Sequence, residues 1–307
     1  MDSTVTTSAR QLPLAPAPSG IAVERDPAAH LVGLLGSAGP DSGQAHEAAC
    51  YHLSSGGKAN RYHLTLRAGL GMGLSDGDAA ALAACVELLH NASLVFDDLQ
   101  DQDSMRRGRP AVWKRFGPSI ALCAGALLMS AAYGALGALS DRRRAAQLLS
   151  HVHARTAALI AGQSADLTIG DDLSLEQYEA IAAQKSGVLF ALPFELVLLY
   201  SGRPQAVSSA TSIATSVAVG YQISDDIADF VADLGSEGSG PRLNYVILAR
   251  GRGSVASALA SAHARALDLL ETAALDASGL PRACGAPLAD FARRLASGLR
   301  QDLAIGG

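Results

Sequence analysis

The sequence has few aromatic and few charged residues. Aromatic side chains make up 5% of the 307 residues and charged side chains 17%, whereas hydrophobic residues make up 49%. So much apolar surface excludes a chain that is disordered throughout. Alanine and leucine dominate, and both favour helices. Strand-like alternation of apolar and polar residues is scarce. The composition therefore predicts an all-α protein.

The chain also lacks an excess of basic residues and any zinc-binding cysteine pattern. Its net charge is −5, which argues against binding nucleic acid through bulk electrostatics. Its cysteines lie far apart, without the CxxC or Cys/His spacing of zinc sites. They are Cys50, Cys85, Cys123 and Cys284. We expect them to be small core residues in a reducing compartment, the cytoplasm.

Membrane spans and a signal peptide are not expected either. We find no apolar run of about 18 residues that is free of charged or strongly polar side chains, so we expect no stable membrane insertion. The first 25 residues are rich in Ser, Thr, Ala and Pro and lack a basic start followed by an apolar block. We predict a flexible tail over residues 1–26 and one helical domain over residues 27–307.

Long apolar segments are what the sequence has in abundance. Their apolar residues lie all round the helix, which is typical of buried helices. We predict helices over 77–99, 119–139, 144–169, 174–200 and 208–232. The run GSEGSGP at 235–241 predicts a loop.

Two acidic clusters each end one of these apolar helices. The first consists of Asp97, Asp98 and Asp101, and the second of Asp225, Asp226 and Asp229. Carboxylates four residues apart share one helix face, about 6 Å apart along the axis. Such hard oxygens suit magnesium that also binds phosphate oxygens. Either cluster alone is more often a solvated helix end, but the pair predicts a site for magnesium and a diphosphate.

Basic residues form a second kind of group. Arg106 and Arg107 follow the first acidic cluster, and an arginine fork fits phosphate oxygens. Lys58 and Arg61 follow two glycines, where the backbone can approach an anion closely. Lys185 starts an apolar run. Each group also has a simpler interpretation. The arginines can merely neutralise the neighbouring acids, the glycine segment can be an ordinary surface loop, and the lysine can extend its ammonium group to solvent. Together these cations predict a second diphosphate site, built without metal.

These motifs resemble those of a known family. The first aspartate-rich region of the trans-isoprenyl diphosphate synthases, or polyprenyl synthetases, is similar to LLHNASLVFDDLQDQDSMRRGRP (88–110). The similarity is greatest to the form of this motif in the geranylgeranyl diphosphate synthases. GYQISDDIAD (220–229) resembles their second aspartate-rich region. GGKANR, GQSADL and QKSGVLF match further family motifs in the correct order. The resemblance covers residues 50–232.

The resemblance implies a fold and a reaction. The fold is a single bundle of mostly antiparallel helices around a deep central cavity, the isoprenoid synthase type. The reaction is the head-to-tail condensation of isopentenyl diphosphate with an allylic diphosphate. Its cofactor is Mg²⁺, as three ions around bound diphosphate by the family's pattern. The family usually forms homodimers.

The resemblance also implies a role for each matched residue. The metal ligands are then Asp97, Asp98, Asp101, Asp225, Asp226 and Asp229. The allylic diphosphate is bound by Arg106, Lys185 and Gln222. Isopentenyl diphosphate is bound by Lys58, Arg61, His90 and Arg107. Lys185, Ser186 and Gln222 face the reacting centre, and Gln163 lines the site.

Product length is expected to depend on the residues one helical turn before Asp97. These are Ala92 and Ser93, where family members that stop at fifteen carbons usually carry a large aromatic residue. Small side chains leave room for elongation, so we expect a twenty-carbon product, with a longer one still open. Leu89 and side chains from 122–133 are candidates for the cavity floor.

Three departures from the family pattern keep alternatives open. The chain has AGA at 124–126 instead of AGD, Trp113 where histidine is common, and no lysine in 230–250. Arg242 is the candidate substitute for that lysine, although arginine does not replace lysine freely. A catalytically weak subunit of a heteromeric synthase is therefore one alternative. A class I terpene cyclase is another, but it needs no second, metal-free diphosphate site.

Overall fold

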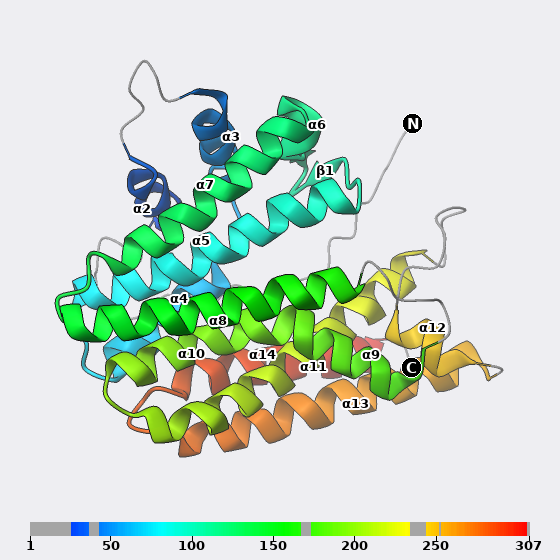
Figure 1. Cartoon of the computed structure of the whole chain (residues 1–307). Helices are drawn as coiled ribbons and strands as arrows, with labels where there is room; N and C mark the ends of the chain where they lie inside the picture. The colour runs from blue at the N-terminus through cyan, green and yellow to red at the C-terminus, as the bar shows by residue number, and fades with distance from the viewer. Residues whose placement is uncertain (1–25, 37–42, 167–172, 234–243, 252, 306–307) are drawn as a thin grey trace.

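The computed structural model describes residues 26–36, 43–166, 173–233, 244–251 and 253–305 (Figure 1). Within these ranges the chain is almost entirely helical, as the sequence predicts, and the only strands are two residues long. The helices of the first half are α2 (Pro27–Leu34), α3 (Gly43–Leu53), α4 (Asn60–Gly71), α5 (Asp76–Gln100), α6 (Val112–Phe116), α7 (Pro118–Leu136) and α8 (Arg142–Asp166). Those of the second half are α9 (Leu175–Ala182), α10 (Val188–Tyr200), α11 (Val207–Asp233), α12 (Tyr245–Arg250), α13 (Val255–Asp276) and α14 (Ala286–Ile305).

Short elements complete the described chain. Strands β1 (Met105–Arg106) and β2 (Arg109–Pro110) form an antiparallel hairpin. A π-helical turn, Ala183–Gly187, joins α9 to α10, and 3₁₀ turns lie at Pro204–Ala206 and Ala277–Gly279. The five predicted helices correspond to α5, α7, α8, the α9–α10 pair and α11. The predicted loop at 235–241 and the predicted tail, apart from Asp26, lie outside the described residues.

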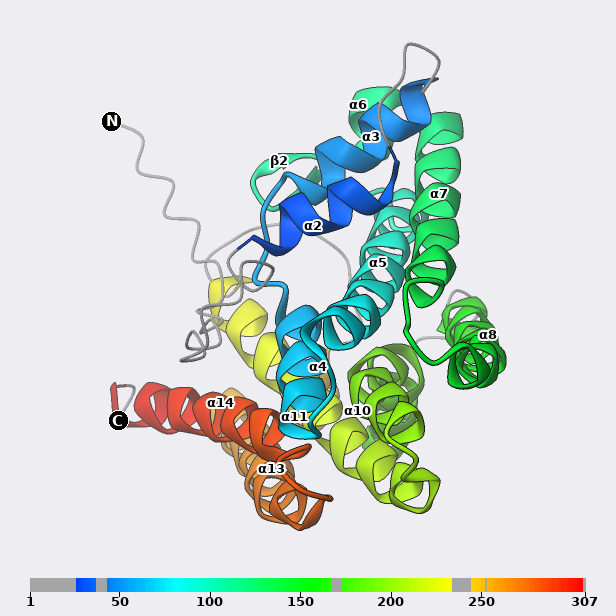
Figure 2. The ribbon, with the colours of Figure 1, turned by 90° about the vertical axis from the view of Figure 1, so that its left-hand side faces the viewer.

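Helix α10 lies at the centre of the bundle. Every residue of α10 except Leu199 is buried, because its side chains are apolar on all faces apart from the single carboxylate of Glu195. It packs against α4, α5, α8 and α11, and α13 packs in turn against α11. Figure 2 shows α10 between the α5–α7 layer and the helices α11, α13 and α14. This is the helical bundle that the sequence predicts.

The bundle brings the predicted motifs to one end. The C-terminal ends of α5, α8 and α11 lie on the same side of the molecule, at the right in Figure 1. Both acidic clusters lie on these ends, and the hairpin β1–β2 follows α5 directly. The fold therefore places the acidic and basic motifs in one region.

The expectation about apolar runs is wrong for α7. This helix has a mean hydropathy of 1.7 without any charged residue, and it is long enough to cross a membrane. α5 and the stretch Leu175–Tyr200 also meet the length and hydropathy required. In those two helices 78% and 72% of the apolar window is buried inside the protein, against 39% in α7. The predicted absence of membrane insertion remains a prediction.

Candidate active site

The hairpin β1–β2 positions the two predicted arginines. Its turn consists of Arg107 and Gly108, with φ of +54° and +74°, and paired positive φ values are typical of tight two-residue hairpins. The side chains around it hold the hairpin in place. The Tyr51 hydroxyl donates to the Pro110 carbonyl at 2.8 Å, and the Trp113 indole donates to the Asp103 carbonyl at 2.8 Å. Arg106 and Arg107 therefore lie on a hairpin that these hydrogen bonds hold in place.

Asp98 is bound to Arg106. The Arg106 Nε donates to Asp98 Oδ1 at 2.8 Å, and the Arg106 Nη2 also contacts this oxygen. Asp98 is fully buried, and its Oδ2 has no hydrogen-bond partner among the described residues. Burial raises the pKa of Asp98, and the adjacent Arg106 charge partly offsets the shift. Asp98 thus has one oxygen on an arginine and one left for another donor or a cation.

Asp97 and Lys185 both line a cavity with a volume of about 420 Å³. We call the end of the cavity at these two residues its mouth. Burial raises the pKa of Asp97 to about 6, while the nearby Lys185 charge lowers it and the Asp101 charge raises it. Gln163 also lines this mouth, and its Nε2 donates to Gln100 Oε1 at 3.0 Å. The mouth of the cavity therefore combines carboxylate, ammonium and amide groups.

The rest of this cavity is mainly apolar. Ser93 lies one helical turn before Asp97 on the same face of α5, and it also lines the cavity. The other lining residues outside the polar end are Leu89, Phe96, Met129, Thr156, Leu159, Ile160 and Leu189. Leu89 and one side chain of the 122–133 segment, Met129, therefore line the cavity, as predicted, and their role as its floor stays a prediction.

Lys185 and Ser186 lie in the π-helical turn between α9 and α10. A π turn widens the helix locally and is often found at functional sites. Gly187 ends this turn, and a Cβ there would lie 3.0 Å from the Thr215 side chain of α11. The sequence analysis predicts a continuous helix over 174–200 and misses this widening, which separates the cavity-lining Lys185 from the buried α10.

A second group, made of the Arg61 cation and the His90 imidazole, lies within electrostatic range of Arg106. The Arg61 Nη1 lies 3.1 Å from His90 Nε2, and the Arg61 Cζ lies 4.5 Å from the centre of the Phe190 ring. Burial, followed by the Arg61 charge, lowers the pKa of His90, so its imidazole is neutral. Arg61 Nε and His90 Nδ1 are buried without a hydrogen-bond partner in the described part of the chain. Both nitrogens are therefore available to donate a hydrogen bond to an anion.

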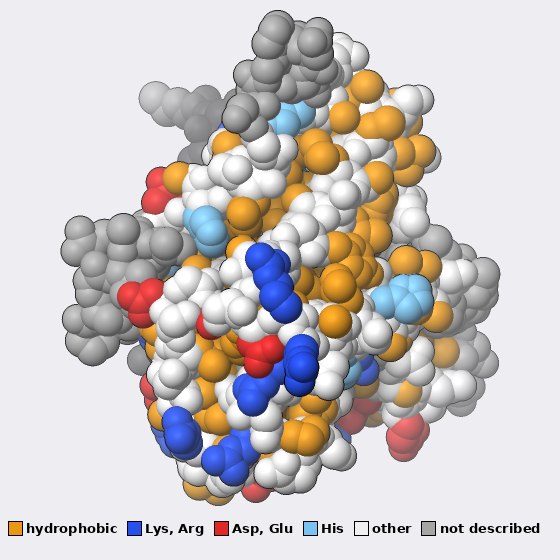
Figure 3. Space-filling model, turned by 60° about the vertical axis from the view of Figure 1, so that its left-hand side comes forward, with side chains coloured by type: hydrophobic (Ala, Val, Ile, Leu, Met, Phe, Trp, Pro, Cys, Tyr) orange, Lys and Arg blue, Asp and Glu red, His pale blue; other side chains and the backbone are white. Residues whose placement is uncertain are grey.

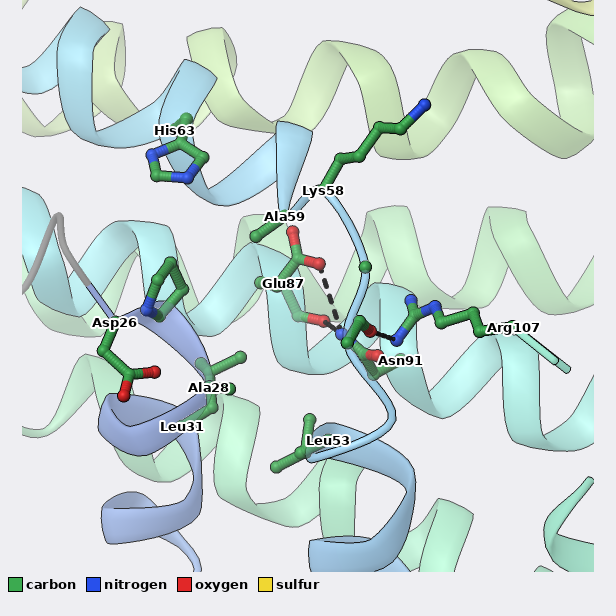
Figure 4. Close-up of a pocket in the computed structure, with 13 residues that line it drawn as sticks. Asp26, Ala28, Leu31, Leu53, Lys58, Ala59, His63, Glu87, Asn91 and Arg107 are labelled. Carbon is green, nitrogen blue, oxygen red and sulfur yellow. Dashed lines mark hydrogen bonds between the residues drawn. The ribbon is translucent and has the colours of Figure 1, made fainter. Parts of the chain in front are cut away.

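The glycine loop before α4 completes this group. Gly57 has φ of +130°, a conformation that residues with a side chain rarely adopt, and a Cβ there would lie 2.6 Å from the Arg107 guanidinium carbon and displace it. The Arg107 Nη1 donates to the Gly56 carbonyl, as Figure 4 shows. In the same view Lys58 points away from the pocket that this loop covers. The charge of Asp225 acts on Lys58, which connects the loop with the second acidic cluster.

Both carboxylate oxygens of Asp226, a predicted metal ligand, accept hydrogen bonds within the protein. Its Oδ2 accepts hydrogen bonds from the Tyr178 hydroxyl and the Tyr245 backbone N–H, both at 2.6 Å. Its Oδ1 accepts one from Gln222 Nε2 at 3.2 Å, so Gln222 is directed at Asp226. Asp226 is buried, whereas Asp229 is exposed and Asp225 is half-buried. The structure therefore ties Asp226 to α9 and α12.

The structure brings most of the predicted residues together in neighbouring pairs. The pairs are Asp97 with Lys185, Asp98 with Arg106, Arg61 with His90, and Lys58 with Asp225. Ala92 lies apart from these pairs, because it is 1% exposed within the core and does not line the cavity, whereas Ser93 does. Arg242 and its loop lie outside the described residues.

The residues present fit magnesium as partial ligands. The donors are carboxylate oxygens, and the orphaned Asp98 Oδ2 leaves one of them uncommitted. Within the described ranges, no three His, Cys, Asp or Glu side chains lie close enough to hold an ion by themselves. Magnesium usually takes one or two carboxylates and completes its shell with substrate phosphate oxygens and water. The site therefore suits an ion that arrives with a diphosphate.

Sequence reasoning missed three residues that shape the site. Glu87 is 3% exposed on α5 and accepts the Tyr62 backbone N–H. Tyr178 holds Asp226, and Phe190 lies under Arg61. A charged residue inside an apolar helix, three residues before His90, was an available signal for Glu87. Nothing in the sequence marks the other two, because both act across the fold.

The chain matches a known protein family by sequence. The family model described as polyprenyl synthetase matches residues 43–240. A short chain isoprenyl diphosphate synthase of Methanothermobacter thermautotrophicus is 32% identical over 160 residues, which are 51% of this chain and 49% of that protein. A (2E,6E)-farnesyl diphosphate synthase of Mycobacterium tuberculosis is 36% identical over 156 residues, 50% of this chain and 43% of that protein. These matches span about half of this chain and less than half of either relative's length.

Solved structures share the fold. A geranylgeranyl pyrophosphate synthetase from Pyrococcus horikoshii superposes with a TM-score of 0.78 at 23% identity, covering 88% of this chain and 94% of that one. A decaprenyl diphosphate synthase from Rhodobacter capsulatus superposes with a TM-score of 0.75 at 20% identity, covering 91% and 97%. The family model covers most of the chain and both acidic motifs. The chain belongs to the polyprenyl synthetase family, the trans-isoprenyl diphosphate synthases.

Proposed function

We propose that the protein condenses isopentenyl diphosphate head-to-tail with an allylic diphosphate to give a linear prenyl diphosphate. One observation carries this proposal, namely that two groups of different construction lie within electrostatic range of each other, since the charge of Arg106 acts on His90. Lys185 and Arg106 stand among carboxylates, whereas Arg61 and His90 form a group with buried, orphaned nitrogens. Two unlike anion sites suit two diphosphates that react differently. The diphosphate of the allylic substrate is the leaving group, whereas that of isopentenyl diphosphate remains attached to the product.

The carboxylate side suits the departing diphosphate. The ligands we propose for magnesium are Asp97, Asp98 through its uncommitted Oδ2, Asp101 and Asp225. Magnesium, when bound, supplies charge stabilisation to the leaving group. Lys185 lies at the cavity mouth and would hold a diphosphate oxygen there through its ammonium. Arg106 is fixed by Asp98, so its guanidinium needs little reorganisation to receive an anion.

The cation side suits the diphosphate that stays. Arg61 and His90 would donate to its oxygens, because Arg61 Nε and His90 Nδ1 are buried and unpaired among the described residues. Lys58 and Arg107 would contact it from the glycine loop and the hairpin. When the diphosphate is bound firmly, the isopentenyl double bond is held in one orientation. A fixed orientation favours its attack on the allylic carbon.

The apolar cavity suits the growing tail. It extends from Asp97 and Lys185 past Ser93 toward Leu89 and Met129. Its apolar lining excludes the water that would quench an allylic cation. We propose a twenty-carbon product because the small Ser93 leaves the passage beneath the diphosphate open.

The test is an incubation of the purified protein with magnesium, isopentenyl diphosphate and, separately, five-, ten- and fifteen-carbon allylic diphosphates. Mass spectrometry reads the products. The proposal predicts a linear twenty-carbon diphosphate that forms only when both substrates are present. A cyclic hydrocarbon formed from the allylic diphosphate alone would indicate a terpene cyclase. No turnover with any primer would favour the weak-subunit alternative, to be tested next with a partner synthase.

We also propose a homodimer that packs through α7. The outward face of α7 carries exposed apolar residues, of which Leu122 is 52% exposed, and the neighbouring α8 exposes Ile160 at 56%. Figure 3 shows hydrophobic side chains gathered over the upper part of the face on which α7 lies. Burying such a face in a second copy removes apolar surface from water. Light scattering of the wild type and of L122D tests this, because a dimer would become a monomer.

A further inference from the structure

Helix α4 begins without a capping side chain of its own. Its N-cap residue is Ala59, which has φ of +44° and makes no side-chain cap hydrogen bond. The first backbone N–H groups of a helix need acceptors, which Ser, Thr, Asp or Asn normally supply. This helix start carries Lys58 and Arg61, so its exact position decides where both cations point.

Glu87 supplies the missing acceptor from another helix. It lies on α5 with 3% of its surface exposed, and its Oε2 accepts the Tyr62 backbone N–H at 2.9 Å. Asn91, one turn further along α5, fixes the carboxylate: its Nδ2 lies 2.8 Å from the Glu87 carbonyl and 3.3 Å from Oε1. In Figure 4 the Glu87 and Asn91 side chains lie together behind the glycine loop.

The charge of Glu87 also faces the arginines of the cation group. Burial raises the pKa of Glu87, while the Arg61 charge and the Tyr62 hydrogen bond lower it. The Glu87 charge in turn acts on both Arg61 and Arg107. A carboxylate at a helix N-terminus is favourable in itself, because it complements the helix dipole. One buried side chain thus contacts the helix start and lies within electrostatic range of two cations.

We propose that Glu87 is a positioning residue for the metal-free diphosphate site. It caps α4 from α5 and thereby holds Arg61 and the Gly56–Lys58 loop in the arrangement that receives the anion. The inference rests on the proposed function for the identity of that anion. It assigns Glu87 no contact with either substrate, and the cap hydrogen bond, rather than the negative charge, carries the effect.

Three variants separate the cap from the charge. E87Q keeps an acceptor oxygen for the Tyr62 N–H and removes the charge. E87D keeps the charge but withdraws the carboxylate by one methylene group, and E87A removes both. Glu195 provides the matched control, because it is 1% exposed and bound to His151 and Thr211 on helices α8 and α11. E195A therefore also deletes a buried carboxylate, away from the cation group.

The readout is calorimetric binding of inorganic pyrophosphate in EDTA, supported by the KM for isopentenyl diphosphate. We expect E87D and E87A to weaken pyrophosphate binding about tenfold, the effect of one lost hydrogen bond of about 1.4 kcal/mol. We expect E87Q and E195A to bind within about threefold of the wild type. In the variants that weaken binding, KM for isopentenyl diphosphate should rise while kcat and KM for the allylic substrate stay nearly constant.

Each other outcome overturns the inference. Equal weakening in E87Q and E87A would assign the effect to the charge, and equal weakening in E195A would make it a general loss of stability. Wild-type binding in E87D would show that the cap is not needed, and this variant keeps the test decisive if E87A does not fold. A wild type that makes product but does not bind pyrophosphate without metal would refute the inference alone, whereas a wild type without turnover would refute the proposed function.

Discussion

The Phe96 ring on α5 occupies the space that a side chain at Gly125 on α7 would fill. A Cβ placed at Gly125 would lie 2.6 Å from the ring atoms Cε1 and Cζ of Phe96. Phe96 also lines the apolar cavity proposed for the growing tail. The absence of a side chain at Gly125 therefore lets the ring lie against α7, beside the tail's path.

Substituting Gly125 by alanine should shorten the product. The added methyl group must displace the Phe96 ring, and the cavity is the open space next to it. Mass spectrometry of the G125A products should show a shift from twenty toward fifteen carbons, and F96L should shift them toward longer chains. An unchanged product pattern in both active variants would show that this contact has no influence on length.

Ser93 and Ala92 should respond differently to a bulky residue. S93F places a ring in the cavity one turn below Asp97, so it should stop elongation at fifteen carbons. A92F places the ring in the packed core, where overpacking costs about 1–3 kcal/mol, without entering the cavity. Urea unfolding and product analysis measure both effects. A shorter product from a fully stable A92F would contradict the assignment of Ala92 to the core.

Asp225 and Asp226 should separate metal binding from stability. D226A leaves the Tyr178 hydroxyl and the Tyr245 N–H without their acceptor, so the free energy of unfolding should fall by about 3 kcal/mol. D225A should change stability by less than about 1 kcal/mol and raise the magnesium concentration for half-maximal rate about tenfold. If D226A raised the magnesium concentration for half-maximal rate to the same extent and left stability unchanged, Asp226 would be a metal ligand.

His52 should make the protein less stable as the pH falls. It is 2% exposed, and burial, with a smaller effect of the Arg107 charge, lowers its pKa from 6.5 to about 3. Below pH 6.5 the unfolded chain takes up a proton at this residue that the folded chain does not, so stability falls toward pH 3. From pH 7 to pH 5 the wild type should lose about 2 kcal/mol more than H52Q. Equal losses by both proteins in urea titrations at the two pH values would contradict this.

The sequence predicts the long helices well because their patterns are local. The apolar residues of α5, α7 and α11 are periodic within each helix, and the two acidic clusters are recognisable by spacing alone. The π-helical turn at Ala183–Gly187 is not predictable in this way, because no local periodicity marks it. It is observed where Gly187 packs against Thr215 of α11, a contact between distant segments.

Roles that depend on contacts across the fold could not be predicted. Asp226 matches a metal ligand by spacing, yet its oxygens accept hydrogen bonds from Tyr178 and Tyr245 on other helices. Ala92 and Ser93 are adjacent and both small, but helix rotation directs one to the core and the other to the cavity. Spacing identifies the candidates, and tertiary packing decides among them.

The central claim is that two diphosphate sites of different construction lie side by side. Calorimetry of isopentenyl diphosphate and of an allylic diphosphate, each with magnesium and with EDTA, tests it most directly. The account predicts that isopentenyl diphosphate binds equally well under both conditions and that R61A abolishes this binding. It predicts that the allylic diphosphate binds tightly only with magnesium. A requirement of isopentenyl diphosphate for magnesium, or tight binding of the allylic diphosphate in EDTA, would contradict it.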